Sequence, residues 1–191
     1  HAGQLVISMG SWAAPMLTGL GLEFTVLRKP LHWYPAERSL YHRDAGCPCF
    51  FYEIPEGHFY GFPAFGNGDL KVALHSGGDR VTDPLELDRG LDHQEQAVVE
   101  QFLGTYLPGV TRRSSGHAVC MYTMAAGRFF VIDRLAQHPG VVIAAGLSGH
   151  GFKFTSVLGE TLCQLLLDGC SALPTEFLSI ENALARQQHA S

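Results

Sequence analysis

The stretch VVIAAGLSGHGFKFTSVLGETLCQLLL, residues 141–167, decides how this chain is interpreted. It begins with β-branched and small apolar residues, passes through Gly146, Gly149 and Gly151, and ends in leucines at helical spacing. This order predicts a strand, a turn and a helix. Glycines at such a junction let backbone N–H groups approach a ligand, and the helix N-terminus favours negative charge. Tight packing at the turn would require the same glycines, so a ligand cradle and an ordinary packed turn both remain open.

Composition excludes several classes of protein. The chain has 191 residues, 46% of them hydrophobic, and a formal net charge of −5, which fits one or two globular domains. A negative net charge gives no basic surface for nucleic acid or an acidic membrane. The sequence has neither an apolar run long enough to span a bilayer nor the features of a signal peptide. Five irregularly spaced cysteines favour a reducing compartment, so we expect a cytoplasmic protein without nucleic-acid or membrane partners.

The N-terminal segment has the sequence pattern of an α/β protein, in which an apolar strand is followed by a helix. The sequence begins with His1 and enters the apolar run GQLVISMGSW, which predicts a buried strand at Leu5 to Ser8. A helix is expected from Ser11 to Leu20, with Ser11 as its N-cap. The abrupt start suggests a piece of a longer chain, and the sequence contains no GxGxxG dinucleotide fingerprint.

The middle of the chain has a different hydrophobic pattern. Short alternating runs between Glu23 and Leu74, separated by PEG and GNG, predict antiparallel strands joined by tight turns. The period of two places Lys71, Ala73 and His75 on one face, which is either a wet outer face or a site. Farther on, Asp92 predicts the N-cap of a helix from about His93 to Tyr106. Its apolar stripe should face the core: Val98, Val99, Phe102, Leu103 and Tyr106.

Two lysines and a cysteine have competing interpretations. Cys120 lies in the apolar run HAVCMYT, and from position alone it reads as a buried, inert thiol. Lys71 and Lys153 would ordinarily be solvated, yet both lie among aromatic residues and glycines, where a lysine tends to act electrostatically. The residues alone do not decide between these alternatives.

Metal and serine-hydrolase chemistry have little support. His75 and His150 show no helical i, i+4 spacing or HxH cluster that would favour a shared metal ion. Cys47 and Cys49 in CPC are a weak zinc or redox signal because a second cysteine pair is missing. The segment LSGHG does not match the GxSxG nucleophile elbow. We therefore expect no metal site.

Three longer motifs resemble one family. GFPAFGNGDLK at 61–71, HAVCMYT at 117–123 and AAGLSGHGFKF at 144–154 are similar, in this order and at these separations, to the flavin-dependent amine oxidases of the monomeric sarcosine oxidase and N-methyltryptophan oxidase type. The resemblance extends over nearly the whole chain and includes VISMGSW at 6–12 and RKPLHWYPAE at 28–37. It implies that the chain is the carboxy-terminal half of such an enzyme, without the half that carries the dinucleotide fingerprint.

The resemblance implies roles for the residues that match the family motifs. Cys120 matches the cysteine that carries FAD covalently, and Lys71 matches the lysine that promotes reaction of the reduced flavin with oxygen. Lys153 matches a lysine that helps bind the substrate carboxylate. Further matches are Tyr60, His75 and Tyr122, which would line the amine pocket, and Gly10, Trp12, Gly146, Gly149, His150 and Gly151, which would contact the cofactor.

The implied reaction is oxidation of an N-methyl amino acid such as sarcosine or N-methyltryptophan. Hydride passes to the flavin, the imine hydrolyses to formaldehyde and the demethylated amino acid, and oxygen is reduced to hydrogen peroxide. Phe50, Phe51 and Trp33 are expected near the substrate face. The sequence does not decide which amine is used, although the residues of two motifs, LHWYPAE and GLSGHGFKFTSVLGE, are closer to those of the N-methyltryptophan branch.

The implied fold is α+β. We expect segments 1–24 and 113–191 to belong to an FAD-binding α/β domain and segment 25–112 to form an antiparallel substrate domain inserted between them. Since the dinucleotide-binding part and an arginine for the substrate carboxylate would lie in the absent amino-terminal half, this piece alone should bind FAD poorly and be inactive. The alternative is a non-catalytic remnant or partner subunit, a binding module that completes its fold with a second chain.

Overall fold

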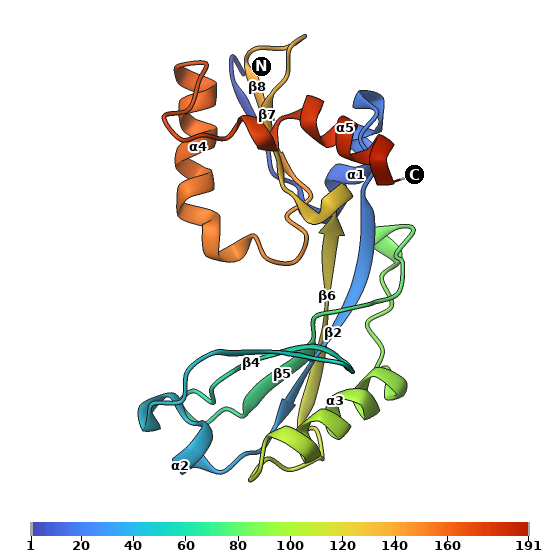
Figure 1. Ribbon diagram of the computed structural model, residues 1–191, viewed down its shortest axis with the longest axis vertical. Helices are drawn as coiled ribbons and strands as arrows, with labels where there is room; N and C mark the ends of the chain where they lie inside the picture. Colours follow the sequence, from blue (N-terminus) through green and yellow to red (C-terminus); the bar gives the residue numbers. More distant parts are fainter. Residues whose placement is uncertain (1, 191) are drawn as a thin grey trace. The chain divides into compact units, whose positions relative to one another are not determined.

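The structure is a computed structural model that describes residues 2–190 (Figure 1). The chain divides into two compact units. Unit 1 comprises His1–Leu27, Arg80–Glu86 and Met121–Ser191, and unit 2 comprises Arg28–Asp79 and Leu87–Cys120. Two of the four boundaries fall inside strands, β2 (Thr25–Tyr34) and β6 (Gly116–Met124). The assignment of such units to a flavin domain and a substrate domain stays a prediction.

Unit 1 is built on a three-stranded sheet in the order β1-β8-β7. β1 (Leu5–Ile7) pairs in parallel with β8 (Val141–Ala145), and β7 (Val131–Arg134) pairs antiparallel with β8. The helices of this unit are α1 (Ala13–Leu17), α4 (Thr155–Leu167) and α5 (Ile180–Ala190). Short 3-10 turns connect them, at Gly10–Trp12, Thr18–Leu20, Pro84–Glu86, Ala126–Arg128, Phe152–Phe154 and Glu176–Leu178.

Alternation along β7 and β8 explains why both faces of this sheet are covered. Val131 and Ile143 point to the face that packs against α1 and α5, while Ile132 and Val142 point to the face that packs against α4. Figure 1 shows α4 on one side of β7 and β8 and α1 with α5 on the other. Apolar runs in both strands are therefore required by burial on two faces.

Unit 2 is an antiparallel sheet covered by one helix. The five-stranded sheet has the order β3-β4-β5-β2-β6, with β3 at Phe50–Ile54, β4 at Gly57–Phe62 and β5 at Leu70–Leu74. The helices are α2 (Arg38–Tyr41), which is followed by a 3-10 turn at Arg43–Ala45, and α3 (His93–Tyr106). β3, β4, β5 and β2 pair antiparallel in sequence, as the alternating runs predicted.

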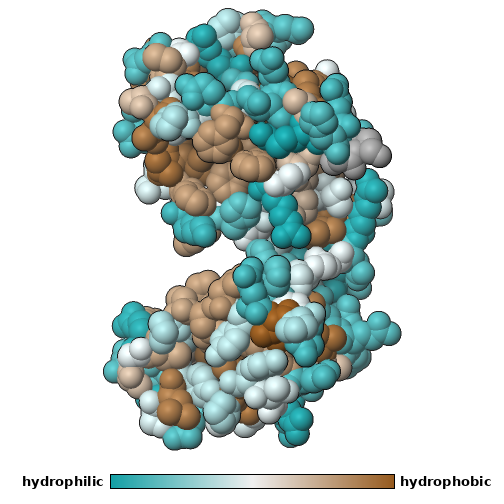
Figure 2. Space-filling view, in the orientation of Figure 1, coloured by the Kyte–Doolittle hydropathy of each residue, from teal (hydrophilic) through white to brown (hydrophobic). Residues whose placement is uncertain are grey.

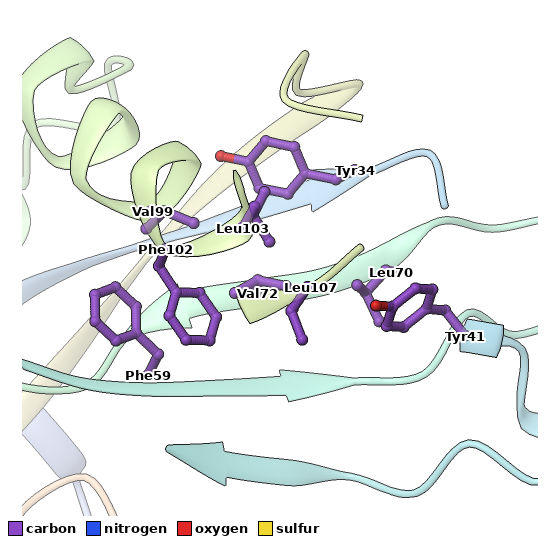
Figure 3. Packing of buried hydrophobic residues seen from close by; sticks show 9 residues of the cluster. All are labelled: Tyr34, Tyr41, Phe59, Leu70, Val72, Val99, Phe102, Leu103 and Leu107. Atoms are coloured by element: carbon purple, nitrogen blue, oxygen red, sulfur yellow. The ribbon is translucent and has the colours of Figure 1, made fainter. Parts of the chain in front are cut away.

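The core of unit 2 lies between α3 and one face of this sheet (Figure 3). Phe59 and Phe102 stack with their ring centroids 4.2 Å apart and their planes nearly parallel. The other residues of this core are Tyr34, Tyr41, Leu70, Val72, Val99, Leu103 and Leu107. Because Leu70 and Val72 face this core, the intervening Lys71 lies on the opposite face of β5.

The structure confirms the strand, turn and helix of residues 141–167 and both ends of α3. Asp92 caps α3 by accepting hydrogen bonds from the backbone nitrogens of Gln94 and Glu95 at 2.9 and 3.0 Å. The expected apolar stripe of α3 was too wide, since Val98 and Tyr106 are 39% and 36% exposed.

Two expectations about the N-terminal segment were wrong. Leu5 and Val6 are 50% and 44% exposed, because β1 is an edge strand of its sheet rather than an interior strand. The helix expected from Ser11 to Leu20 is a series of short turns around α1, and Ser11 is not its cap. The buried Ser11 hydroxyl instead lies 3.2 Å from the Thr123 hydroxyl.

The α+β class is confirmed by this mixture of an antiparallel sheet with a helix and a second helix-covered sheet. No helix within residues 2–190 is both long and apolar enough to cross a membrane. All five cysteines are free thiols.

Candidate functional site

In unit 2, the predicted pocket residues Tyr60 and His75 and the predicted oxygen-activating Lys71 lie on the sheet face opposite the core. Tyr60 lies opposite Ala73 in the β4–β5 register, and His75 follows the end of β5. The Tyr60 and His75 rings are 6.2 Å apart and nearly perpendicular. The Phe51 ring contacts His75 at 5.4 Å, also edge to face. The period of two therefore placed Lys71 and His75 on one face correctly.

The ammonium group of Lys71 lies between two aromatic rings. Nζ is 5.0 Å from the centroid of Phe62 and 6.0 Å from that of Trp33, both of which are register partners of Lys71 on neighbouring strands. An aromatic face attracts a cation at such distances. The lysine is half-buried, so the rings hold a positive charge against the sheet instead of releasing it into solvent.

One expectation about this face was wrong. Phe50 does not lie with Phe51 on the substrate side, because consecutive residues of a strand point to opposite faces. The Phe50 ring packs against the core of unit 2 and fills the space where a Cβ of Gly61 would stand, at 2.1 Å. Phe51 is 52% exposed, as expected for a residue on the open face.

Cys120 also belongs to unit 2. It lies on β6, and its side chain is exposed, whereas its neighbour Val119 is buried. The buried thiol expected from position alone is therefore wrong, because the alternation of β6 turns Val119 inward and Cys120 outward. An exposed thiol on a rigid strand can react with a group that lies outside the unit.

In unit 1, the glycines of the turn after β8 are required by packing. Gly146 and Gly149 have φ values of +62° and +78°, in the left-handed region. A Cβ on Gly149 would lie 2.4 Å from the ring of Tyr122, and one on Gly146 would lie 2.6 Å from Ala125 Cβ. A Cβ on Gly151 would meet the side chain of Leu147 at 2.6 Å. The packed turn, which the sequence left open, accounts for all three glycines.

Ser148 at the centre of this turn was not singled out by the sequence. It is buried, has a φ of +50°, and its hydroxyl donates to the Gly146 carbonyl oxygen at 2.9 Å while accepting from the Ala125 nitrogen at 3.2 Å. Its nitrogen donates to the Thr123 carbonyl oxygen at 2.9 Å. Ser148 therefore fixes the turn to the end of β6, next to Tyr122. The position of Ser148 between Gly146 and Gly149 in GLSGHG was the available signal.

His150 and Lys153 line an open pocket of about 500 Å³ next to α4. The His150 ring packs on Phe130 with centroids 4.8 Å apart, and its Nδ1 lies 3.0 Å from the Ser148 carbonyl oxygen. Most of the remaining lining is apolar, with three further phenylalanines at Phe129, Phe154 and Phe177. Hydrophobic residues gather at the surface of this part of unit 1 in Figure 2. The pocket combines an aromatic wall with two cationic side chains, Lys153 and Arg128.

Gly10 and Trp12 differ from the other predicted cofactor residues. Gly10 has a φ of +56°, yet a Cβ added there would meet nothing within 4 Å. Trp12 is 42% exposed. The left-handed φ therefore accounts for the glycine, and the open space leaves room for a ligand close to its backbone.

The candidate residues fall into two groups. Tyr60, Lys71, His75 and Cys120 belong to unit 2. The members of unit 1 are Gly10, Trp12, Tyr122, Gly146, Gly149, His150, Gly151 and Lys153. Residues 2–190 contain no group of three or more His, Cys, Asp or Glu side chains that could hold a metal ion.

Sequence reasoning missed a buried polar cluster between β2 and α3. Lys29 and His32 are 1% and 0% exposed. Burial lowers the pKa of His32 to about 4 and, despite the opposing effect of Lys29, raises the pKa of Glu95 to about 7. The dipeptide RK before Pro30, in a strand that is otherwise apolar, was the available signal.

Comparison with known proteins identifies the family. The family described as FAD dependent oxidoreductase matches residues 1–165. Monomeric sarcosine oxidase from Arthrobacter sp. (strain TE1826) is 38% identical over 98% of this chain, and N-methyl-L-tryptophan oxidase from Salmonella typhi is 36% identical over 87%. The chain spans 49% and 44% of these two proteins, about half the length of the curated relatives it matches.

Solved structures share the fold. The amino acid oxidase NikD superposes with a TM-score of 0.73 over 93% of this chain and 48% of that chain, at 19% identity. L-proline dehydrogenase from P. horikoshii gives 0.77 over 97% and 47%, at 17% identity. The resemblance carried by the three sequence motifs is thereby confirmed. The chain belongs to the FAD dependent oxidoreductase family.

Proposed function

We propose that the intact protein oxidises an N-methyl amino acid at its C–N bond and that this chain supplies the amine pocket and the cofactor tether. The observation that carries the proposal is the grouping of Tyr60, Lys71 and His75 on one sheet face, with the Lys71 ammonium between two aromatic rings. The names of the relatives support a secondary amine as substrate. Sarcosine and N-methyltryptophan are the first candidates.

The residues present fit FAD in two respects. The exposed thiol of Cys120 could form a thioether with the 8α-methyl group of a flavin that lies outside unit 2, where the S–H and a methyl C–H bond are broken and the two electrons pass to the flavin and then to oxygen. The backbone at Gly10 has open space where a side chain would stand. The glycines at 146, 149 and 151 add no such space, because the chain's own side chains fill it. We therefore base the cofactor proposal on Cys120 and Gly10, and we keep Trp12 and His150 as further proposed cofactor contacts.

When bound, FAD would accept a hydride from the substrate and pass two electrons to oxygen. The amine, oxygen and water would be converted to the demethylated amino acid, formaldehyde and hydrogen peroxide. In this scheme Lys71 stabilises the negative charge that develops on oxygen, because an ammonium held in a partly dry aromatic setting acts more strongly than one in water. Tyr60 and His75 would line the amine, while amine contact by Tyr122 and carboxylate binding by Lys153 stay predictions from the family resemblance.

The test of Lys71 uses the intact protein, with the cofactor bound. We expect Lys71→Met to slow reoxidation by oxygen by about 100-fold, the effect typical for loss of one electrostatic donor. Arg43→Met is the matched control, because Arg43 also lies over a phenylalanine, Phe65, at 4.3 Å, but is exposed. A Lys71→Met variant that reoxidises as fast as the parent protein contradicts the role.

The tether is tested by acid precipitation. We expect yellow flavin absorbance to remain with the precipitated intact protein and to be lost from Cys120→Ala. Cys49→Ala is the control, since Cys49 is also an exposed thiol in unit 2. Flavin that stays with the Cys120→Ala precipitate would assign the tether to another residue. The isolated 191-residue chain is expected to bind FAD poorly.

A further inference from the structure

Lys29 holds three consecutive backbone carbonyls with one buried ammonium group. Its Nζ donates to the carbonyl oxygens of His75, Ser76 and Gly77 at 3.1, 3.0 and 3.2 Å. An ammonium has three donors, and these three acceptors match that number. Gly77, with a φ of +63°, turns the backbone in this segment.

Burial of this ammonium group costs free energy, so its presence requires a physical reason. Lys29 is only 1% exposed, and burial of an ammonium costs several kcal/mol of free energy unless its protons are matched. Burial lowers the pKa of Lys29, and the nearby Glu95 carboxyl opposes this effect. A leucine or methionine would fill the same space without this cost. The charge thus has a function in fixing the turn that a hydrophobic residue would not provide.

The same turn is held from its other side by β4. The His75 nitrogen donates to the His58 carbonyl oxygen at 2.6 Å, and the His58 nitrogen donates to Ser76 Oγ at 3.1 Å. With both sides fixed, the backbone of His75 has little freedom. Its ring is thereby directed towards Phe51 and Tyr60, on the face that carries Lys71.

We propose that Lys29 is a positioning residue of the amine pocket: its buried ammonium fixes the turn at residues 75–77 and thereby the direction of the His75 ring. The inference rests on the proposed function only in taking His75 as part of that pocket. The contacts of Lys29 Nζ with this turn are to backbone carbonyl oxygens, so Lys29 acts on His75 through the backbone.

Arg28 offers a matched control on the same strand. It is also buried, and its guanidinium donates to the carbonyl oxygens of Asp88 and Gly90, which belong to a different loop. Lys29→Met and Arg28→Met each remove one buried cation that binds loop carbonyls. Both should lower thermal stability, but only Lys29→Met should affect His75.

The experiment combines two readouts on the intact protein. The first is the histidine side-chain NMR spectrum, in which His75→Gln assigns the His75 resonance. We expect Lys29→Met to shift or broaden that resonance and Arg28→Met to leave it unchanged. The second is a double-mutant cycle on the KM for the amine. Lys29→Met should raise KM about tenfold in the parent and less than about twofold in the His75→Gln background, since residues that act through one another are non-additive.

Each outcome decides the proposal. An unchanged His75 resonance in folded Lys29→Met, or the same change in KM in both backgrounds, overturns it. If Lys29→Met does not fold, Gly77→Ala disturbs the same turn through its left-handed backbone, with no atom within 4 Å of the new Cβ, and should move the same resonance; an unmoved resonance overturns the proposal. If no amine is oxidised, the proposed function fails, while the NMR comparison still decides the role of Lys29.

Discussion

Replacement of Gly149 by alanine tests the packed turn after β8. The backbone there has a φ of +78°, and the new Cβ would lie 2.4 Å from two atoms of the Tyr122 ring. The left-handed conformation costs a non-glycine residue about 1–2 kcal/mol, and overpacking adds about 1–3 kcal/mol. We therefore expect the free energy of unfolding of the intact protein to fall by about 2–5 kcal/mol. Because Tyr122 must move, the KM for the amine should also rise.

Two controls separate the cost of the left-handed backbone from the cost of overpacking. Gly21 has almost the same φ, +75°, but its added Cβ would make only an ordinary contact with Leu184 at 3.4 Å, so Gly21→Ala should cost about 1–2 kcal/mol. Gly159 lies within α4 with nothing near its Cβ position, and Gly159→Ala should stabilise by about 0.5–1 kcal/mol. The measurement is denaturant unfolding. If Gly149→Ala is no more costly than Gly21→Ala, the close packing of Tyr122 on Gly149 is refuted.

Three further substitutions test unit 2 by the unfolding of the intact protein. Asp92→Ala removes the α3 cap and should lower the free energy of unfolding by about 1–2 kcal/mol. An unchanged free energy of unfolding would show that the cap does not stabilise the protein. Phe102→Ala, at a side chain 3% exposed, should cost about 3–5 kcal/mol, whereas its control in unit 1, Phe152→Ala at 94% exposed, should be neutral. Burial raises the pKa of Glu95 from its ordinary value of 4.5 to about 7, so its contribution to stability is present below pH 4.5 and lost as the pH rises through 7. After allowance for solvent screening, Glu95→Gln should gain about 1 kcal/mol over the parent protein at pH 8 and nothing at pH 4.

Local signals in the sequence were enough for several elements. The bounds of α3 followed from a capping aspartate and a terminating Pro108 and Gly109, because both act within a few residues. The face shared by Lys71 and His75 followed from the period of two in β5. The resemblance added the cofactor and the reaction, which spacing alone did not indicate.

Other features depend on tertiary context that periodicity does not contain. The exposure of Leu5 and Val6 depends on the place of β1 at a sheet edge. The inward direction of Phe50 depends on which face of β3 meets α3. Lys29 was missed because a buried lysine is rare, and its three carbonyl partners lie more than 45 residues away in sequence.

The most direct test of the proposed function is the stoichiometry of products from the intact protein supplied with sarcosine or N-methyl-L-tryptophan. We expect one formaldehyde and one hydrogen peroxide for each amine consumed, with one oxygen taken up. Oxidation of neither amine would contradict it, and so would oxidation that releases peroxide without formaldehyde, since the bond broken would then not be the one to the N-methyl carbon.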